Sequence, residues 1–231
     1  MTEITTFTGT VTKKENLTSE VILLSLKISE DFTFKAGQFV TIRINNGEES
    51  KLKSYSILSP PYQKGQLDLC IKIISGGFAS EIFEKTAMGN EFELKGPFGH
   101  FIFDEESSNT EHVFLGAGTG LVPLYSMIKE HLPKHPNKKF TLIFGTKTQK
   151  DLLFHEELQQ LENESSNFTY LPTLTREYWD GKSGRVQEHL GDNLKNKTFY
   201  ICGLKELVLD TKGILVSKGV DLKNIKYQRY S

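Results

Sequence analysis

The segment Val113-Phe114-Leu115-Gly116-Ala117-Gly118-Thr119-Gly120-Leu121-Val122-Pro123 predicts a strand, a glycine turn and the start of a helix. Glycines let a backbone approach a ligand closely, and the first turn of a helix offers free N–H groups to a phosphate. The spacing is not the dinucleotide-binding Gly-x-Gly-x-x-Gly, because the residue three after Gly118 is Leu121. Taken alone, the motif fits either a phosphate-binding turn or a tight turn with nothing bound.

Around this stretch, strands and helices alternate. The predicted strands are 112–115, 140–144, 168–174 and 198–202, and the predicted helices are 121–131, 152–161, a short 186–190 and 205–218. Such alternation indicates an α/β domain with a parallel sheet and helices on both faces. Ligands bind at the carboxyl ends of the strands in open sheets of this kind. Distinctive residues follow three of the strands: Gly116 to Gly120, Thr175-Arg176 and Cys202-Gly203.

The part of the chain before this domain has a different pattern. Short alternating segments, separated by turns with Gly, Asn or Pro, predict strands at 7–13, 20–28, 39–44, 51–58, 67–74 and 91–94, with one helix at 79–87. Six strands at this spacing favour an antiparallel β-barrel. We therefore expect a two-domain α+β chain, with a six-stranded barrel over 1–105 and the α/β domain over 106–231.

Composition narrows the class of function. The 231 residues carry a formal net charge of -1, so no overall basic excess favours nucleic acid or an anionic membrane. No apolar run is long enough to span a bilayer, and the polar N-terminus predicts no signal peptide, so a cytoplasmic location is expected. Two cysteines are too few for an iron–sulfur cluster, and the six histidines show no metal-ligand spacing. We predict no metal, and any one-electron partner is expected to be another molecule.

Two motifs together resemble the ferredoxin–NADP(+) reductase family. Gly-x-Gly-Thr-Gly-x-x-Pro, at 116–123, resembles its nicotinamide-pyrophosphate loop, and Lys53-Ser54-Tyr55-Ser56 resembles its flavin motif Arg-x-Tyr-Ser. The resemblance implies that Tyr55 packs on the flavin of FAD, that Ser56 lies near flavin N5, and that Lys53 binds the FAD pyrophosphate. Lys53 stands where arginine is usual, and lysine supplies the charge without the planar bidentate fork.

A third motif extends the implied FAD site. The predicted strand 67–74, which carries Ile71, Lys72 and Ile73, leads to Gly77-Phe78-Ala79-Ser80, which resembles the family's Gly-x-x-Ser helix start. All seven residues are predicted to bind FAD. Ser80 is expected to cap the helix, whose free N–H groups can hold the second FAD phosphate. Gly96-Pro97-Phe98-Gly99 then resembles the family's closing strand.

The implied nicotinamide site lies in the second domain. The predicted NADP-binding residues are Gly118, Thr119, Gly120, Thr175, Arg176, Arg185, Cys202 and Gly203. Arg176, with Arg185, would hold the 2′-phosphate of NADP, which favours NADP(H) over NAD(H). Tyr230 is expected to stack on the flavin, and with Ser56 and Cys202 it completes the predicted catalytic set. Gln228 stands where the family commonly has a glutamate, and an amide cannot relay protons.

The resemblance, over about residues 6–230, implies an FAD-dependent oxidoreductase. Such a flavoprotein would move electrons between NADPH and a ferredoxin or flavodoxin by hydride transfer at flavin N5. Three alternatives remain: a free-flavin reductase, an NADH-dependent reductase component of an oxygenase, and a non-catalytic flavin-binding subunit.

Overall fold

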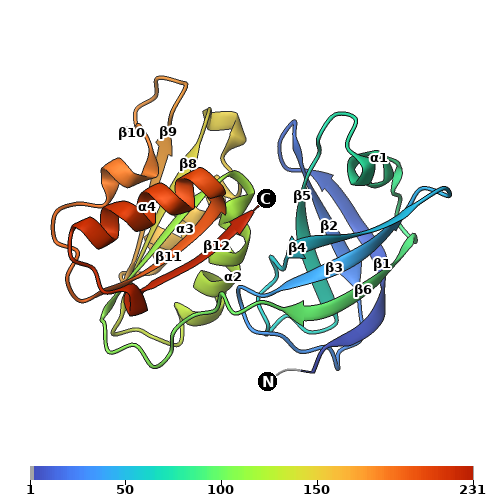
Figure 1. Cartoon of the computed structure of the whole chain (residues 1–231), viewed down its shortest axis with the longest axis horizontal. Helices are drawn as coiled ribbons and strands as arrows, with labels where there is room; N and C mark the ends of the chain where they lie inside the picture. The colour runs from blue at the N-terminus through green and yellow to red at the C-terminus, as the bar shows by residue number, and fades with distance from the viewer. Residues whose placement is uncertain (1–2, 231) are drawn as a thin grey trace. The chain divides into compact units, whose positions relative to one another are not determined.

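The structure is a computed structural model that describes residues 3–230. Residues 1, 2 and 231, at the ends of the predicted 1–105 and 106–231 domains, lie outside the described part. The chain divides into two compact units, 1–102 and 103–231. The first contains an antiparallel sheet and one helix, and the second contains a parallel sheet with helices (Figure 1).

The first unit is a six-stranded antiparallel sheet in the order β4-β3-β6-β1-β2-β5. Its elements are β1 (Thr5–Asn16), β2 (Val21–Lys27), β3 (Phe39–Asn45), β4 (Ser50–Ser56), β5 (Gln66–Lys72), α1 (Phe78–Lys85) and β6 (Glu91–Phe98). The sheet curls until its two outer strands meet just beyond β4. There, Ile57 bridges Leu69, and the Leu58 N–H donates to the Asp68 carbonyl over 2.8 Å. The predicted antiparallel architecture with one helix is confirmed.

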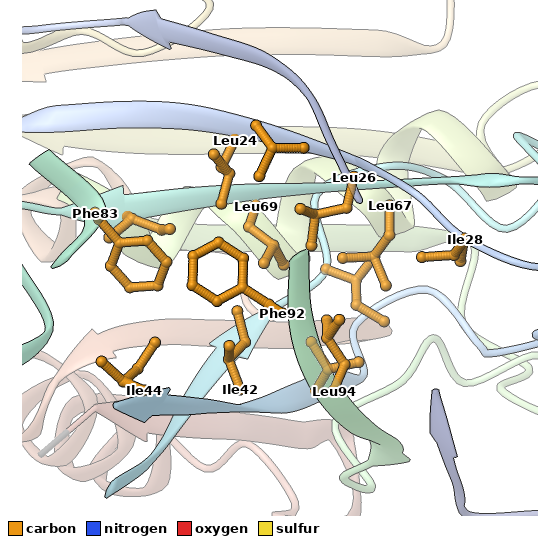
Figure 2. Close-up of a cluster of buried hydrophobic side chains, with 14 of the residues drawn as sticks. Leu24, Leu26, Ile28, Ile42, Ile44, Leu67, Leu69, Phe83, Phe92 and Leu94 are labelled. Carbon is orange, nitrogen blue, oxygen red and sulfur yellow. The ribbon is translucent and has the colours of Figure 1, made fainter. Parts of the chain in front are cut away.

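Alternation along the strands builds the core of this unit. In β3, Val40, Ile42 and Ile44 are buried while Arg43 and Asn45 are exposed, as the two-residue period of a strand requires. Leucines of β2 and β5 meet these side chains from the opposite wall (Figure 2). Phe83 of α1 is fully buried in the same cluster, so α1 is part of this core.

The second unit is a six-stranded sheet in the order β10-β9-β8-β7-β11-β12, and every pairing in it is parallel. Its strands are β7 (Glu111–Ala117), β8 (Lys139–Thr146), β9 (Phe168–Leu174), β10 (Lys182–Ser183), β11 (Lys197–Leu204) and β12 (Ile225–Tyr230). Its helices are α2 (Leu121–His131), α3 (His155–Glu164) and α4 (Lys205–Ser217).

Helices cover both faces of this sheet, as the alternating sequence pattern predicts. Phe199 and Ile201 of β11 pack in one cluster with Val208 and Leu215 of α4. On the opposite face, Tyr200 stacks with Phe103, which in turn stacks on His131 at the end of α2. Nearly every residue of β11 is buried, which is the expected pattern for a strand covered on both faces.

Helix α3 and strand β12 are among the elements that differ from the sequence prediction. Helix α3 begins at His155 rather than 152, because Thr148 and Asp151 form a capping box that closes a separate 3-10 turn at Gln149–Asp151. Phe154 then takes a left-handed conformation with φ of 53°. Strand β12 was not predicted, although it pairs with β11 along its whole length and places Tyr230 beside Leu204.

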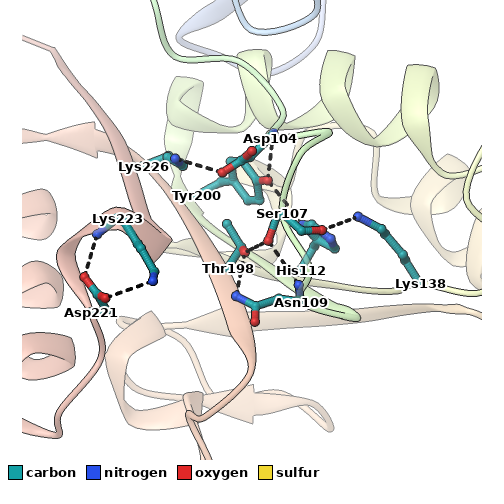
Figure 3. Close-up of polar contacts among 10 residues, drawn as sticks. All are labelled: Asp104, Ser107, Asn109, His112, Lys138, Thr198, Tyr200, Asp221, Lys223 and Lys226. Atoms are coloured by element: carbon teal, nitrogen blue, oxygen red, sulfur yellow. Dashed lines mark hydrogen bonds and ion pairs between the residues drawn. The ribbon is translucent and has the colours of Figure 1, made fainter.

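The segment that opens the second unit is tied to the sheet by polar contacts (Figure 3). The Asp104 N–H donates to the Tyr200 hydroxyl over 3.1 Å, and the Asp104 carboxylate pairs with Lys226 at 2.9 Å. Ser107 shares a 2.8 Å hydrogen bond with Thr198. Among residues 3–230, no helix is long and apolar enough to cross a membrane.

Candidate functional site

The glycine turn lies at the carboxyl edge of the parallel sheet. Strand β7 ends at Ala117, a 3-10 turn spans Gly118–Gly120, and α2 begins at the next residue. A Cβ added to Gly120 would lie 2.3 Å from the Cys202 carbonyl oxygen, so only glycine fits there. Gly118 has φ of 55°, and a Cβ built there would meet no atom within 4 Å. The structure therefore brings the turn against Cys202-Gly203 and leaves Gly118 open.

A hydrogen-bonded group forms beside this turn. Because β12 runs parallel to β11, Tyr230 lies at the same edge of the sheet, and its hydroxyl donates to the Thr119 carbonyl over 3.3 Å. The same hydroxyl hydrogen-bonds to the Cys202 thiol. Cys202 is fully buried, and this burial raises its pKa to about 12. At neutral pH the thiol is therefore protonated, which suits a packing and positioning group better than a nucleophile.

Thr175 and Arg176 follow β9 at the same carboxyl edge. Their N–H groups donate to the carbonyls of Thr146 and Lys147, over 3.1 and 2.9 Å, so the chains after β8 and β9 run side by side. Lys147 and Arg176 are both exposed there. We call this pair the Lys147–Arg176 edge. Lys147 was not predicted from the sequence, although it stands directly after a strand of the sheet, as Arg176 nearly does.

Arg185 lies in a different setting. Its guanidinium pairs with Asp210 of α4 at 3.8 Å, and both side chains are largely exposed. Its backbone N–H donates to Glu188 over 2.9 Å. An exposed pair of this kind contributes little stability, yet it directs the arginine toward α4. The two arginines predicted for the 2′-phosphate therefore have different surroundings.

The loop between β9 and β10 is held in place by its own side chains. The Glu177 carboxylate accepts the Gln149 N–H over 2.7 Å, and the Trp179 indole N–H donates to the Lys182 carbonyl over 2.6 Å. Thr173, fully buried, donates to the Gly184 carbonyl over 2.8 Å. These bonds fix the segment that carries Arg176.

In the first unit, the predicted flavin motif occupies β4. The strand is exposed from Ser50 to Ser54, Tyr55 is half-buried, and Ser56 at its end is 7% exposed. The Tyr55 ring meets Phe83 of α1 edge-on, with centroids 5.6 Å apart. Burial raises the pKa of Tyr55 to about 12, so its hydroxyl stays protonated at neutral pH. An exposed strand ending in a half-buried aromatic ring offers an open surface to a planar ligand.

The start of α1 lies beside this strand. Helix α1 begins at Phe78, and its first-turn N–H groups at Phe78, Ala79 and Ser80 have no carbonyl partner in the helix. A Cβ on Gly77 would lie 2.9 Å from the Ile74 carbonyl oxygen, so glycine allows the tight entry. Cations on β4, the Tyr55 ring and these amides are groups that fit a flavin dinucleotide.

The expectation that Ser80 caps α1 is wrong. The N-cap residue is Gly77, and the Ser80 hydroxyl instead accepts the Ile74 N–H over 2.9 Å. The reason is that α1 begins earlier than predicted, which places Ser80 in the first turn with its side chain buried. Upstream, Ile71 is buried, Lys72 pairs with Glu20 at 3.2 Å, and the Ile73 N–H donates to the Glu20 carbonyl.

The predicted catalytic residues are divided between the units. Ser56 belongs to the first unit, whereas Cys202 and Tyr230 belong to the second and contact each other there. Within the second unit the structure also gathers Thr119, Gly120 and Gly203 around Cys202. Within the first unit it gathers the β4 motif and the start of α1.

Two family models match the chain in sequence. The oxidoreductase FAD-binding domain matches residues 8–103, and the oxidoreductase NAD-binding domain matches residues 114–213. Together they span most of the chain and cover both groups of predicted cofactor-binding residues except those after 213.

The chain is similar to known proteins in sequence and in fold. The phenol hydroxylase P5 protein of Acinetobacter pittii is 26% identical over 97% of this chain. Ferredoxin–NADP reductase B of Sorangium cellulosum is 28% identical over 86% of this chain. In fold, a cytochrome P450 reductase from Amycolatopsis matches 99% of this chain and 71% of its own with a TM-score of 0.92, at 22% identity.

The relatives differ in how much of their length this chain covers. It spans 65% of the phenol hydroxylase P5 protein and 86% of the ferredoxin–NADP reductase. Both family models, their order along the chain, and the two groups of site residues lead to one assignment. The chain belongs to the ferredoxin–NADP(+) reductase family of FAD-dependent NAD(P)H oxidoreductases.

Proposed function

We propose that this oxidoreductase takes a hydride from NADPH onto FAD and passes the electrons singly to a ferredoxin or flavodoxin, in the cytoplasm. The observation that carries the choice of carrier is the match to a ferredoxin–NADP reductase over 86% of both chains. The observation that carries NADPH is the exposed Lys147–Arg176 edge, because a 2′-phosphate dianion requires positive charge that a plain ribose does not.

Bound FAD supplies the two-electron to one-electron conversion. The residues of this chain bind and orient the reactants. Tyr55 offers a ring and a protonated hydroxyl to the flavin, and Ser56 would donate a hydrogen bond to it. Cys202, neutral and buried, would shape the nicotinamide site without acting as a base or nucleophile.

The pyrophosphate of the nicotinamide dinucleotide would bind at the glycine turn. The open side of Gly118 and the start of α2 give a phosphate backbone N–H groups at short range. Thr119 contributes its backbone there, while its carbonyl accepts the Tyr230 hydroxyl. Holding the dinucleotide at both its pyrophosphate and its 2′-phosphate would orient the nicotinamide. Such positioning of the reacting groups supplies much of the rate of hydride transfer.

The first experiment is stopped-flow reduction of the flavin-loaded protein by NADPH and by NADH at equal concentration. Rapid bleaching by NADPH, with NADH much slower, supports the NADPH assignment. Comparable rates overturn the nucleotide preference and leave the reductase assignment standing. Bound flavin that neither nucleotide reduces would instead identify a non-catalytic flavin-binding subunit.

A second candidate is the reductase component of an oxygenase. The observation that favours it is the match to the phenol hydroxylase P5 protein over 97% of this chain. Measuring electron transfer from the NADPH-reduced protein to a ferredoxin, a flavodoxin and free FMN separates the candidates. Fast reduction of the ferredoxin or flavodoxin supports the proposal. Slow reduction of all three acceptors favours the oxygenase component, whose acceptor is another protein, and turnover with free FMN alone indicates a free-flavin reductase.

A further inference from the structure

Three alternate residues of β4 share the face that meets α1. Side chains two residues apart on a strand point to the same side, so Lys51 and Lys53 lie on the side of Tyr55. Tyr55 meets Phe83 of α1 edge-on at 5.6 Å, which fixes that side as the one facing the helix. The two lysines therefore stand in a row along the strand on the helix-facing side.

Lys51 reaches the start of α1. Its Nζ atom lies 4.4 Å from the centroid of the Phe78 ring, and Phe78 is the first residue of the helix. Its ammonium also pairs with Glu49 at 2.7 Å, and its side chain is 44% exposed. A cation over an aromatic face is attracted to it, so Phe78 holds the Lys51 ammonium beside the first turn of α1.

The position of Lys51 matters because the flavin motif has a lysine, Lys53, where two phosphate contacts are expected. FAD carries two negative charges on its pyrophosphate, and the motif supplies Lys53 where a bidentate arginine is usual in the family. A single lysine is a point charge with a flexible stem and cannot bridge two phosphate oxygens in a planar fork. A second point charge on the same face would supply the second contact and would add a positive charge to match the two negative charges of the pyrophosphate.

We propose that Lys51 is a second FAD-phosphate-binding residue, which acts with Lys53 and the first-turn amides of α1 to hold the pyrophosphate. Phe78 orients its ammonium before FAD arrives, which lowers the entropic cost of ordering a long side chain on binding. The inference rests on FAD binding by the first unit and is independent of the identity of the electron carrier or the nicotinamide dinucleotide.

The chain contains a matched control for Lys51. Lys13 of β1 is also an exposed strand lysine paired with a glutamate two residues away, Glu15, at 2.6 Å. In the sheet order, β3, β6 and then β1 follow β4, so Lys13 is separated from the flavin motif by two strands. Loss of Lys13 removes the same charge and the same type of ion pair without touching the α1 start.

The experiment uses the full-length chain, stripped of flavin and titrated separately with FAD and with riboflavin, which lacks the phosphates. Lys51→Met is expected to raise the Kd for FAD about tenfold, as for the loss of one charge-assisted hydrogen bond, while the Kd for riboflavin changes less than twofold. Lys51→Arg should keep the Kd for FAD close to the wild-type value. Lys13→Met should leave the Kd values for FAD and for riboflavin unchanged. Glu49→Gln, which frees the Lys51 charge, should tighten FAD binding and leave riboflavin unaffected.

Two results would overturn the proposal. Equal weakening of FAD and riboflavin by Lys51→Met would show that Lys51 only supports the fold around α1, and unchanged FAD binding would show no phosphate contact. Thermal unfolding of the Lys51→Met apoprotein, expected to match wild type, excludes misfolding as the cause. A wild-type chain that binds neither flavin would instead overturn the FAD assignment itself.

Discussion

Gly120 is the residue on which the geometry of the glycine turn depends. A Cβ there would lie 2.3 Å from the Cys202 carbonyl oxygen and 2.9 Å from the Gly203 Cα, and both atoms belong to the backbone of β11. Backbone in a central strand cannot shift cheaply, because its hydrogen bonds join it to both neighbours. The turn and the Cys202-Gly203 segment therefore hold each other in place.

Gly120→Ala is expected to lower the free energy of unfolding of the second unit by about 1–3 kcal/mol, as overpacking does, and to weaken NADPH binding. Urea unfolding and NADPH titration measure the two effects. Gly213→Ala is the matched control, because its Cβ meets no atom within 4 Å and it lies inside α4. That change should raise the stability by about 0.5–1 kcal/mol. A harmless Gly120→Ala would show that β11 yields to the turn.

Cys202 provides a test of reactivity at the same place. Burial raises its pKa to about 12, so from pH 6 to pH 9 the folded protein holds it as the unreactive thiol. Cys70 is also buried, and burial raises its pKa as well. We expect iodoacetamide at pH 8 to label neither cysteine in the native protein and both in urea, as read by mass spectrometry. Labelling of native Cys202 would contradict the positioning role.

Among the elements, Arg176 and Arg185 both follow β9 in the sequence, but they contact different parts of the second unit. Arg176 hydrogen-bonds through its backbone beside Lys147, whereas the Arg185 guanidinium pairs with Asp210. Arg176→Ala is expected to raise the Kd for NADPH at least tenfold, about 1.5–3 kcal/mol for a charged hydrogen bond, with little effect on NADH. Arg185→Ala should change it less than threefold.

Titration of both variants with NADPH and NADH checks this difference. Equal losses for the two variants would show that Arg185 leaves Asp210 to share the 2′-phosphate. Loss of NADH binding by Arg176→Ala would show instead that the arginine supports the loop rather than the phosphate.

Periodicity predicted most of these elements because each strand and helix buries one face or both. Strand β9 and helix α2 have the predicted bounds, since apolar runs there end at clear turns. Strand β12 was missed because its alternate residues, such as Tyr227 and Arg229, are exposed at the edge of the sheet. Its position comes from pairing with β11, which is a contact distant in sequence.

The site shows the same division. The glycine turn and the β4 motif are local, so their residues could be named from the sequence. The proposed roles of Lys147 and Lys51 could not be predicted from the sequence, because each depends on a contact with another element. Lys147 lies beside Arg176 after β9, and Lys51 lies beside Phe78 at the start of α1. Ser80 was misassigned because a helix start depends on backbone angles at Gly77 that residue types alone leave open.

At the scale of the whole molecule, the two units differ in their histidines. Five of the six histidines, all but His100, lie in the second unit. His112 is fully buried, shares a 3.2 Å hydrogen bond with Tyr200, and within residues 3–230 its Nε2 atom is buried with no partner. His131 is also buried and stacks on Phe103. For both, burial is the main cause that lowers the pKa from 6.5 to about 4.

Acid should therefore unfold the second unit before the first. Above pH 6.5 both histidines are neutral in the folded and unfolded chains, so their contribution is constant. Between pH 6.5 and about 4 only the unfolded chain binds these protons, and each histidine removes up to about 3 kcal/mol of stability over this window. Below pH 4 both states are protonated and the loss stops.

The single tryptophan, Trp179, lies in the second unit and reports its unfolding, while release of bound FAD reports the first. Between pH 6.5 and 4.5 we expect the Trp179 transition to move to lower urea concentration more steeply than the FAD transition. His112→Phe keeps a ring among Phe103, Phe140 and Tyr200 and removes one titrating group. The number of protons taken up on unfolding, given by the slope of the unfolding free energy against pH, should fall by about one for the Trp179 transition. Transitions that shift together at every pH would mean that the two units unfold as one cooperative body.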